Sequence, residues 1–543
     1  MATTTPERVG EEIHKYTVLS SDFRAQKNSF LPIFRIPPET LTSIFLYAAR
    51  NYYEGNVRPT FRAPCWVNVS YVCRHWRRVA LNCPTLWTYH FTASLRWTEE
   101  LLARSKQASL KIHIKYDYNR DKPWWSRLVE KVLNHAGRIQ ELRLTLLGDI
   151  LPAEFSLNAP RLEILDIDIW RYPSKRTLII NHGDSLPLRT LKLAYCPLPW
   201  DSTFNLSGVT TLSLCDVPSP CQQNVMELLA TLSQMQALTA LHLEDALPSS
   251  RSFLSSEVFG VSAKVSLPCL TRFLVRAPLS TVVALVSCIG IPLKTHVTLE
   301  SESEDDSSID DYFRLPSVVS HRFGHSEDPS SSSPAIRSLV MRFSYNSIFT
   351  CSASERGDCD PNPSLSYPPR DCNMPLLFFV TVEPSMTIDN RDRIAGDICC
   401  SIPSTHVQSL HVIDPPFSPD FWRKILGHLD GLRYMKLSSG TVCMPDLVSL
   451  LTSPADGPVD PTSSDHDRTP GHTFVPALEE LELDCITFTS EDDWLEVSEQ
   501  SIRDALSTRK ALRLTMTQCD EESEEEDESD ICQSDQYLSQ ESE

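Results

Sequence analysis

The chain has 543 residues and a formal charge of −21, with 71 acidic against 50 basic side chains. Twelve acidic residues lie in 515–543 and seven in 300–311, and neither segment contains Lys or Arg, so the rest of the chain is close to neutral. This distribution argues against nucleic acid as a partner, and 16 glycines against 39 prolines argue against a glycine-dependent nucleotide fold.

The first helix of a folded unit is expected after the proline pair at 37–38. Proline presets φ at the first helical position, where its missing N–H costs nothing. Leu41, Ile44 and Phe45 then follow at helical spacing and form one apolar face. The preceding residues 1–29 are expected to form a flexible lead.

A second helix is expected from Val69 to Ala80. Val69, Val72, Cys73 and Trp76 recur at steps of three and four and form an apolar stripe. Helices this short cannot bury all of their apolar faces against one another, so part of this surface is expected to bind a partner. The alternative is an ordinary helical hairpin with a tryptophan core.

Together these segments resemble the F-box. The family pattern is a Leu-Pro-type start, Leu-x-x-Ile-Phe, Val-Cys-x-x-Trp-Arg and a closing Leu-Trp, and its pieces stand here at 36–39, 41–45, 72–77 and 86–87. The phrase Val-Ser-x-Val-Cys-Arg-x-Trp-Arg-x-Val-Ala, followed by Pro-Thr-Leu-Trp, is similar to F-box proteins of mushroom-forming (basidiomycete) fungi. Two departures are Ile36 in place of Leu and a long insert at 47–65.

Downstream, over residues 91–514, the chain repeats the phrase apolar-x-x-apolar-x-apolar. Its ten copies begin at Ile139, Leu162, Leu188, Val209, Leu238, Leu270, Ile336, Val407, Leu432 and Leu478. A short strand phrase at a loose period, with helical material between copies, is the leucine-rich-repeat signature. We expect an irregular leucine-rich-repeat-like solenoid, because no single unit of this kind is stable alone. A conventional sheet with leucine-rich strands is the alternative.

The predicted fold class is α/β (α+β), with a three-helix F-box over 30–90 followed by the solenoid. Mobile insertions are expected near 300–333, 351–372 and 452–471, where Ser, Asp and Pro are concentrated. The acidic residues 515–543 are expected to form a disordered tail, because they cannot bury enough apolar surface to fold.

The residue between the two core positions of each strand should point to the open face of such an array. The basic members of this set are Arg143, Lys192, His242, His411 and Lys436. They predict a face that binds an acidic or phosphorylated segment of a protein substrate through charge-assisted hydrogen bonds. A solvated face without a ligand is the alternative.

Motifs of catalysis are not found. The sequence contains no G-x-S-x-G, no phosphate-binding glycine loop, no H-E-x-x-H and no C-x-x-C. We therefore expect no enzyme, no metal and no cofactor. The 17 scattered cysteines, the polar start and the lack of a long apolar run predict a cytoplasmic or nuclear protein with reduced thiols and no membrane partner.

The resemblance implies a function, since F-box proteins join a Skp-family adaptor, and through it a cullin, to a target protein. It implies a substrate-recognition subunit of a ubiquitin ligase whose protein substrate is unknown. The residues it assigns to adaptor binding are Pro37, Pro38, Leu41, Ile44, Phe45, Val69, Val72, Cys73 and Trp76, with Phe45 and Trp76 as the aromatic anchors. The alternative is a leucine-rich-repeat interaction scaffold that recruits no ligase.

Overall fold

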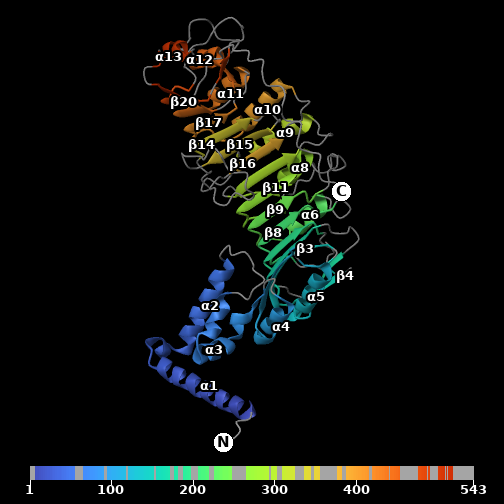
Figure 1. Ribbon diagram of the computed structural model, residues 1–543. Helices are drawn as coiled ribbons and strands as arrows, with labels where there is room; N and C mark the ends of the chain where they lie inside the picture. Colours follow the sequence, from blue (N-terminus) through green and yellow to red (C-terminus); the bar gives the residue numbers. More distant parts are fainter. Residues whose placement is uncertain are drawn as a thin grey trace, which may run out of the picture. The chain divides into compact units, whose positions relative to one another are not determined.

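The computed structural model divides into two compact units. Unit 1 comprises Met1–Ala277 and Ala284–Pro292, and unit 2 comprises Pro278–Val283 and Leu293–Glu543 (Figure 1). The structure describes residues 6–54, 65–90, 94–117, 120–148, 150–151, 154–170, 177–181, 187–196, 206–218, 225–247, 265–292, 295–302, 309–323, 336–343, 348–354, 376–381, 387–414, 419–438, 441–452, 475–485, 487–489, 499–507, 509 and 512–517.

Unit 1 begins with helices. They are α1 (Pro6–Ser29), η1 (Pro32–Arg35), α2 (Pro38–Glu54), η2 (Cys65–Tyr71), α3 (Arg74–Leu81) and η3 (Pro84–Trp87). The expectation of a flexible lead over 1–29 is wrong for the described residues 6–29, which form α1. Their composition favours a helix, with Glu7 in the first turn and Lys27 in the last, where each charge complements the helix dipole. Asp22 of α1 forms an ion pair with Arg74 of α3, at 2.7 Å.

The second expected helix is divided in two. The 3₁₀ helix η2 ends at Tyr71, and α3 begins only at Arg74. Between them Cys73 is extended (φ −159°, ψ 170°), and its Sγ accepts a hydrogen bond from the backbone N–H of Trp76 at 3.4 Å, so it caps α3. The β-branched residues before it favour this break, because they lower helix propensity.

Eight strands of unit 1 form one parallel arrangement, in the order β1-β2-β3-β5-β7-β8-β9-β11. Their bounds are β1 Tyr89–His90, β2 Leu110–Lys115, β3 Ile139–Leu147, β5 Ile164–Trp170, β7 Thr190–Ala194, β8 Thr211–Cys215, β9 Ala240–Glu244 and β11 Arg272–Pro278. Sequence neighbours are therefore also spatial neighbours, except where β4 (Glu154–Asn158) pairs in parallel with β6 (Thr177–Asn181), and β10 (Val265–Ser266) with β12 (Ile289–Gly290).

The repeated phrase sets the strand register. Its second apolar positions lie directly opposite one another across six strands: Leu142, Leu165, Leu191, Leu212, Leu241 and Phe273. All six side chains are at most 1% exposed. Because side chains alternate along a strand, the intervening residues share the opposite face, which is polar.

A recurrent turn follows several of these strands. The residue after the strand has a positive φ of 46–56° at Tyr195, Asp216 and Asp245 in unit 1, and at Asp414 and Cys485 in unit 2. Its backbone N–H donates to a carbonyl at the end of the neighbouring strand, as Asp216 N does to Glu244 O at 2.8 Å. Aspartate tolerates this left-handed conformation better than most residues, which is how a glycine-poor chain can form such turns.

The remaining helices of unit 1 are α4 (Leu95–Arg104), α5 (Lys122–Leu133), η4 (Ala136–Arg138), α6 (Val225–Leu232) and α8 (Leu279–Cys288), the last of which also contributes residues to unit 2. Each of α4, α5 and α6 buries apolar side chains. Trp125 of α5, for example, is 0% exposed and packs against Tyr116, which follows β2, with ring centroids 5.4 Å apart.

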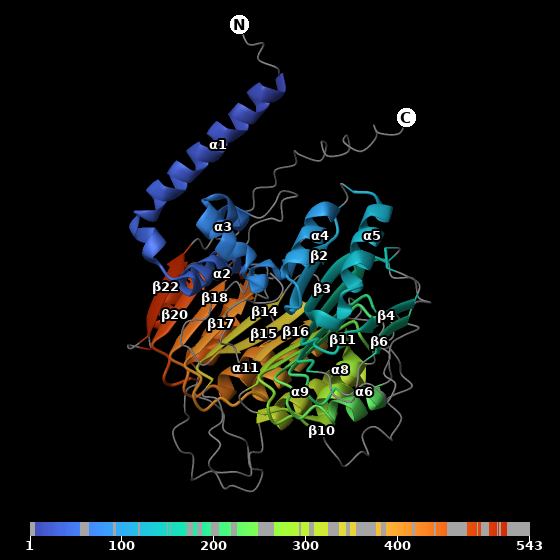
Figure 2. The ribbon, with the colours of Figure 1, turned by 90° about the horizontal axis from the view of Figure 1, so that it is seen from below.

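Unit 2 contains its own set of strands, in the order β13-β16-β15-β14-β17-β18-β20-β22 (Figure 2). Their bounds are β13 His296–Glu302, β14 Ser338–Phe343, β15 Ile348–Ser354, β16 Leu376–Thr381, β17 Ser409–Ile413, β18 Tyr434–Ser438, β20 Glu480–Asp484 and β22 Arg513–Thr517. Pairing is parallel except that β15 lies antiparallel to both β14 and β16. A separate parallel pair joins β19 (Thr441–Cys443) and β21 (Thr487–Thr489).

The helices of unit 2 follow one another along one side of these strands (Figures 1 and 2). They are α9 (Ile309–Phe323), α10 (Ile388–Cys400), α11 (Pro419–His428), α12 (Met444–Thr452) and α13 (Glu499–Leu506), and each contacts the next in this order. Cys399 of α10 lies 3.5 Å from Met341 of β14, and both side chains are buried. These helices therefore cover the apolar face of the strands.

Several expected insertions differ from the structure. The expectation of a mobile segment near 300–333 is wrong for α9, where Tyr312, Leu315 and Val319 recur at helical spacing and are buried. Residues 351–354 belong to β15, and 515–517 to β22. The remainder of the segments 351–372 and 515–543, and residues 453–471, lie outside the described residues. Among the described helices, none combines the length and apolar character needed to cross a bilayer.

Candidate functional site

The N-terminal helical region, residues 32–90, is organised around an apolar core. Its buried members include Leu41, Phe45, Ala49, Trp66, Val67, Val79, Ala80, Cys83, Leu86 and Trp87. Trp87 is 0% exposed and donates a hydrogen bond from Nε1 to Ala80 O at 2.8 Å. Its ring lies 5.4 Å from that of Trp66, and the Arg104 guanidinium lies 4.5 Å from its centroid. Trp87 therefore ties η3 to both α3 and η2.

Other apolar side chains of this region face outward. On α2, Ile44 is 46% exposed and Tyr47 is 67% exposed. Where η2 gives way to α3, Tyr71 is 68% exposed and Val72 is 60% exposed. We call these four residues the exposed apolar set. Since α2 contacts both η2 and α3, the set belongs to one packed group of helices. Such surface is typical of a protein-binding site.

The structure sorts the nine residues expected to bind an adaptor. Leu41 and Phe45 are buried in the core, whereas Val69, Cys73 and Trp76 are partly buried. The exposed members are Pro37, Pro38, Ile44 and Val72. The interpretation of Phe45 as an anchor is wrong for this structure, because it is 1% exposed and packs 5.1 Å from the Trp76 ring. The 3.6-residue spacing that placed Phe45 on the apolar face cannot say whether that face meets the core or a partner.

The polar face of the unit 1 strands carries the first three residues expected to bind a substrate. Arg143, Lys192 and His242 occupy one row across the strands, together with Asp166 and Ser213. Lys192 is exposed, whereas Arg143 is bound by carboxylates. Its Nε lies 2.7 Å from Glu141 Oε1, and its Nη1 lies 3.9 Å from Asp166.

Glu141 is the centre of that cluster. Its Oε1 also lies 2.8 Å from His113 Nε2, and its Oε2 lies 3.8 Å from Lys111 Nζ. Burial raises the pKa of Glu141, but the hydrogen bonds and positive charges of His113 and Arg143 outweigh it and lower the pKa to about 2. The basic groups of this cluster therefore face an ionised carboxylate of their own chain.

A second cluster lies where β8 and β9 pair. Cys215, His242 and Glu244 place one donor atom each within 4.8 Å of the others, and all three are partly buried. His242 Nε2 is 3.3 Å from Glu244 Oε2, and His242 Nδ1 is 3.2 Å from Ser213 Oγ. Arg276 Nη1 lies 3.2 Å from the other oxygen, Glu244 Oε1. Burial and then the nearby acidic groups raise the pKa of Cys215 to about 11, although a Ser213 hydrogen bond opposes them.

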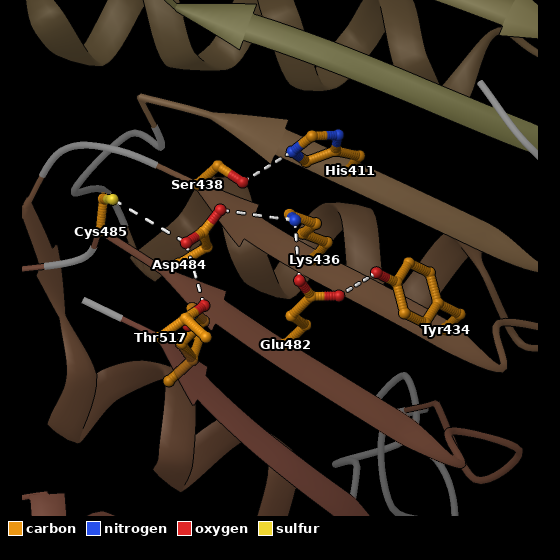
Figure 3. A network of polar contacts seen from close by, with 9 residues as sticks. His411, Tyr434, Lys436, Ser438, Glu482, Asp484, Cys485 and Thr517 are labelled. Carbon is orange, nitrogen blue, oxygen red and sulfur yellow. Dashed lines mark hydrogen bonds and ion pairs between the residues drawn. The ribbon is translucent and has the colours of Figure 1, made fainter. Parts of the chain in front are cut away.

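The remaining two expected residues, His411 and Lys436, lie in unit 2 (Figure 3). Lys436 Nζ is 2.7 Å from Glu482 Oε1 and 3.5 Å from Asp484 Oδ2, and the Glu482 hydrogen bond raises the pKa of Lys436. The Tyr434 hydroxyl donates to the second oxygen of Glu482, so that both carboxylate oxygens are bound within the chain. On the other side, Thr517 Oγ1 donates to Asp484 at 2.9 Å.

His411 is the clearest correction to the expected substrate face. It is 8% exposed, and its Nε2 is within 2.8 Å of Ser438 Oγ. Burial, followed by the charge of Lys436, lowers the pKa of His411 to about 4. The imidazole is therefore neutral at pH 7 and is poorly placed to bind an acidic segment.

The repeated phrase alone does not place three acidic partners of these basic residues. Glu141, Glu244 and Asp484 stand two residues before or after a strand's central position, so they share its face. The alternation of side chains along a strand, continued beyond the repeated phrase, predicts that these acidic residues lie on the polar face. It therefore predicts the balance of acidic and basic side chains there, and not only the basic ones.

Comparison with known proteins identifies one part of the chain. A family model described as F-box-like matches residues 33–93, the segment that contains the apolar core and the exposed apolar set. A comparison with curated proteins gives no match for the chain. The similarity to proteins of mushroom-forming fungi stays a prediction.

Proposed function

We propose, from the F-box-like domain at residues 33–93, that this chain is the substrate-recognition subunit of a Skp–cullin–F-box ubiquitin ligase. The observation that carries the proposal is the coincidence of this domain with exposed apolar side chains. A short helical domain that leaves Ile44 and Val72 exposed has surface to offer a partner. F-box domains typically bind Skp-family adaptors, and the cullin would be reached through the adaptor.

Adaptor docking would use residues that the free chain leaves accessible. Ile44, Tyr47, Tyr71 and Val72 would be buried on binding, and the exposed Pro37 and Pro38 extend the apolar surface at the start of α2. The partly buried Trp76 would complete the contact, because its ring lies over Phe45 at the edge of the core. Leu41 and Phe45 would support this surface from below without touching the adaptor.

The strands downstream would hold the substrate. We infer that they are an irregular leucine-rich-repeat-like array, and three features support this. The apolar phrases stand in register, successive strands are parallel neighbours, and the turns after them recur with the same backbone conformation. The antiparallel β15 departs from the pattern, which is why we call the array irregular.

In this role the chain would be a non-catalytic receptor of the cytoplasm or nucleus. Binding a substrate to the array while the F-box-like domain holds the ligase raises the effective concentration of substrate lysines near the charged conjugating enzyme. No residue of this chain then needs to touch the reacting thioester.

Adaptor capture by the purified full chain tests the proposal. The informative variant is Ile44→Asp/Val72→Asp, since both side chains are exposed and their replacement leaves the core intact. Met226→Asp is the matched control, because Met226 is 41% exposed on α6, outside the matched domain. We expect the intact chain and the control to capture a Skp-family adaptor and the double variant to lose it.

Two other outcomes would refute it. If a folded intact chain captures no adaptor, the ligase role fails and the interaction-scaffold alternative is favoured. If the double variant captures the adaptor as well as the control does, the exposed apolar set is not the docking surface. Circular dichroism of each variant shows whether it has kept its fold.

A further inference from the structure

We propose that Cys215, His242 and Glu244 form a binding site for a zinc ion on the polar face of unit 1. The three residues stand on two adjacent parallel strands, with Cys215 directly opposite Glu244 and Ser213 directly opposite His242. All four side chains share the face opposite the buried Leu212, Leu214, Leu241 and Leu243. Strand pairing brings their donor atoms together, although the three residues match no metal-binding sequence motif.

Two neighbours orient the ligands. Ser213 Oγ lies 3.2 Å from His242 Nδ1, which directs the other ring nitrogen, Nε2, toward the cluster. Arg276 Nη1 binds Glu244 Oε1 at 3.2 Å, which leaves Oε2 on the side of the histidine. Metal-ligating histidines and carboxylates usually have such outer partners, which fix the tautomer and the ring direction.

The geometry between the two ligands also favours a cation. His242 Nε2 and Glu244 Oε2 lie 3.3 Å apart, close to the separation of two ligands on one zinc ion. A metal ion bound between them would replace the hydrogen bond that joins the two side chains. Cys215 Sγ lies within 4.8 Å of one donor atom of each of these residues and adds the soft donor that distinguishes a metal site from an ordinary ion pair.

The donor set selects the metal by its chemistry. Sulfur, imidazole nitrogen and carboxylate oxygen together suit Zn²⁺, whereas Mg²⁺ and Ca²⁺ prefer oxygen alone. Zinc bonds of about 2.0–2.3 Å place tetrahedral ligands roughly 3.5 Å apart, so the side chains need to close by about 1 Å. On binding, the Cys215 thiol releases its proton to solvent and coordinates as the thiolate.

Three protein ligands leave one position of the tetrahedron for water or for a donor from a bound protein. This site stands on the polar face at the end of β8 and β9, beside the exposed Lys192 of β7. A zinc ion there would add positive charge to a face whose other cations are mostly bound by carboxylates. Metal binding at this site does not require adaptor binding.

Cobalt(II) is the probe for this site, because tetrahedral cobalt–thiolate centres absorb strongly in the near ultraviolet and visible. The full chain, freed of metal by a chelator, is titrated with Co²⁺ and then with Zn²⁺. We expect one equivalent of Co²⁺ to produce the thiolate charge-transfer and tetrahedral ligand-field bands, and Zn²⁺ to abolish them. Cys215→Ser should remove the charge-transfer band, and Cys485→Ser, at an exposed cysteine of unit 2, should keep it.

Further variants make the test decisive. His242→Gln and Glu244→Gln should each weaken zinc binding, and Ser213→Ala should weaken it by about 10–100-fold through the lost orientation of the ring. These three decide the outcome if Cys215→Ser fails to fold. The absence of cobalt bands in the folded chain would overturn the proposal, as would bands that persist in Cys215→Ser.

Discussion

Trp87 provides a direct test of the core of the N-terminal helical region. The indole is fully buried, packs against Trp66, and donates to Ala80 O at 2.8 Å. Trp87→Ala removes all of these contacts, and truncation of a buried aromatic side chain costs about 3–5 kcal/mol. Trp87→Phe keeps most of the ring but removes the indole donor, while Ala80 O keeps its hydrogen bond from Cys83 N at 3.2 Å, so the loss is that of one hydrogen bond, about 0.5–1.5 kcal/mol.

Hydrogen–deuterium exchange of peptides from α2 and α3 measures these costs locally, because protection reports the free energy of opening. At about 1.4 kcal/mol for each factor of ten, Trp87→Ala should lower protection roughly 10²- to 10⁴-fold, and Trp87→Phe roughly 2- to 12-fold. Trp170→Phe is the matched control, since Trp170 is 49% exposed on β5. Unchanged protection of α2 in Trp87→Ala would refute the assignment of Trp87 to this core.

Two further predictions concern the pH dependence of stability, measured as thermal unfolding across pH. Folding lowers the pKa of Glu141 from 4.5 to about 2, which stabilises the folded state by about 3 kcal/mol above pH 4.5. This stabilisation is lost as the pH falls toward 2. Glu141→Gln should therefore destabilise the protein at pH 7 and progressively less in acid. A loss that is equal at all pH values would contradict the ion-pair explanation. The pKa of His411 is lowered to about 4 by burial and by Lys436, against the opposing Glu482 and Asp484, so the unfolded chain binds a proton between pH 6.5 and 4 that the folded chain does not. Stability should therefore decrease as the pH is lowered from 6.5 to 4, and His411→Asn should reduce this pH dependence. An unchanged slope of stability against pH in His411→Asn would show that His411 does not cause it.

The spacing of apolar residues was sufficient to predict those strands and helices in which a single period determines the structure. The phrase around Leu142, repeated through Leu165 and Leu191, predicted strands whose apolar residues are now seen in register. The proline pair likewise predicted the start of α2, and the spacing of Leu41 and Phe45 predicted its apolar face. In each case, neighbouring residues carry the information.

Sequence periodicity did not predict the structure where contacts between distant parts of the chain determine it. Helix α9 is flanked by acidic and serine-rich residues, and this composition predicted a mobile segment. The helical spacing of its buried residues Tyr312, Leu315 and Val319 was overlooked for that reason. Strand β15 pairs antiparallel on both sides, which no repeated phrase can specify. The spacing of Ile44 and Phe45 is helical for both, yet only the packing of η2 and α3 leaves one exposed and buries the other.

The polar face of the strands in each unit is therefore better described by its charge pairs than by its basic residues. Arg143 and Lys436 already bind carboxylates of their own chain, and His411 is buried. An acidic partner would have to displace Glu141 or Glu482 from ion pairs that are already formed, and it would gain little from the exchange. A segment that carries both signs could instead extend the pairs across the strands, approaching Lys192 with a carboxylate and Asp166 with a cation. Selectivity on such a face would come from the order of charges along the partner and not from its net charge.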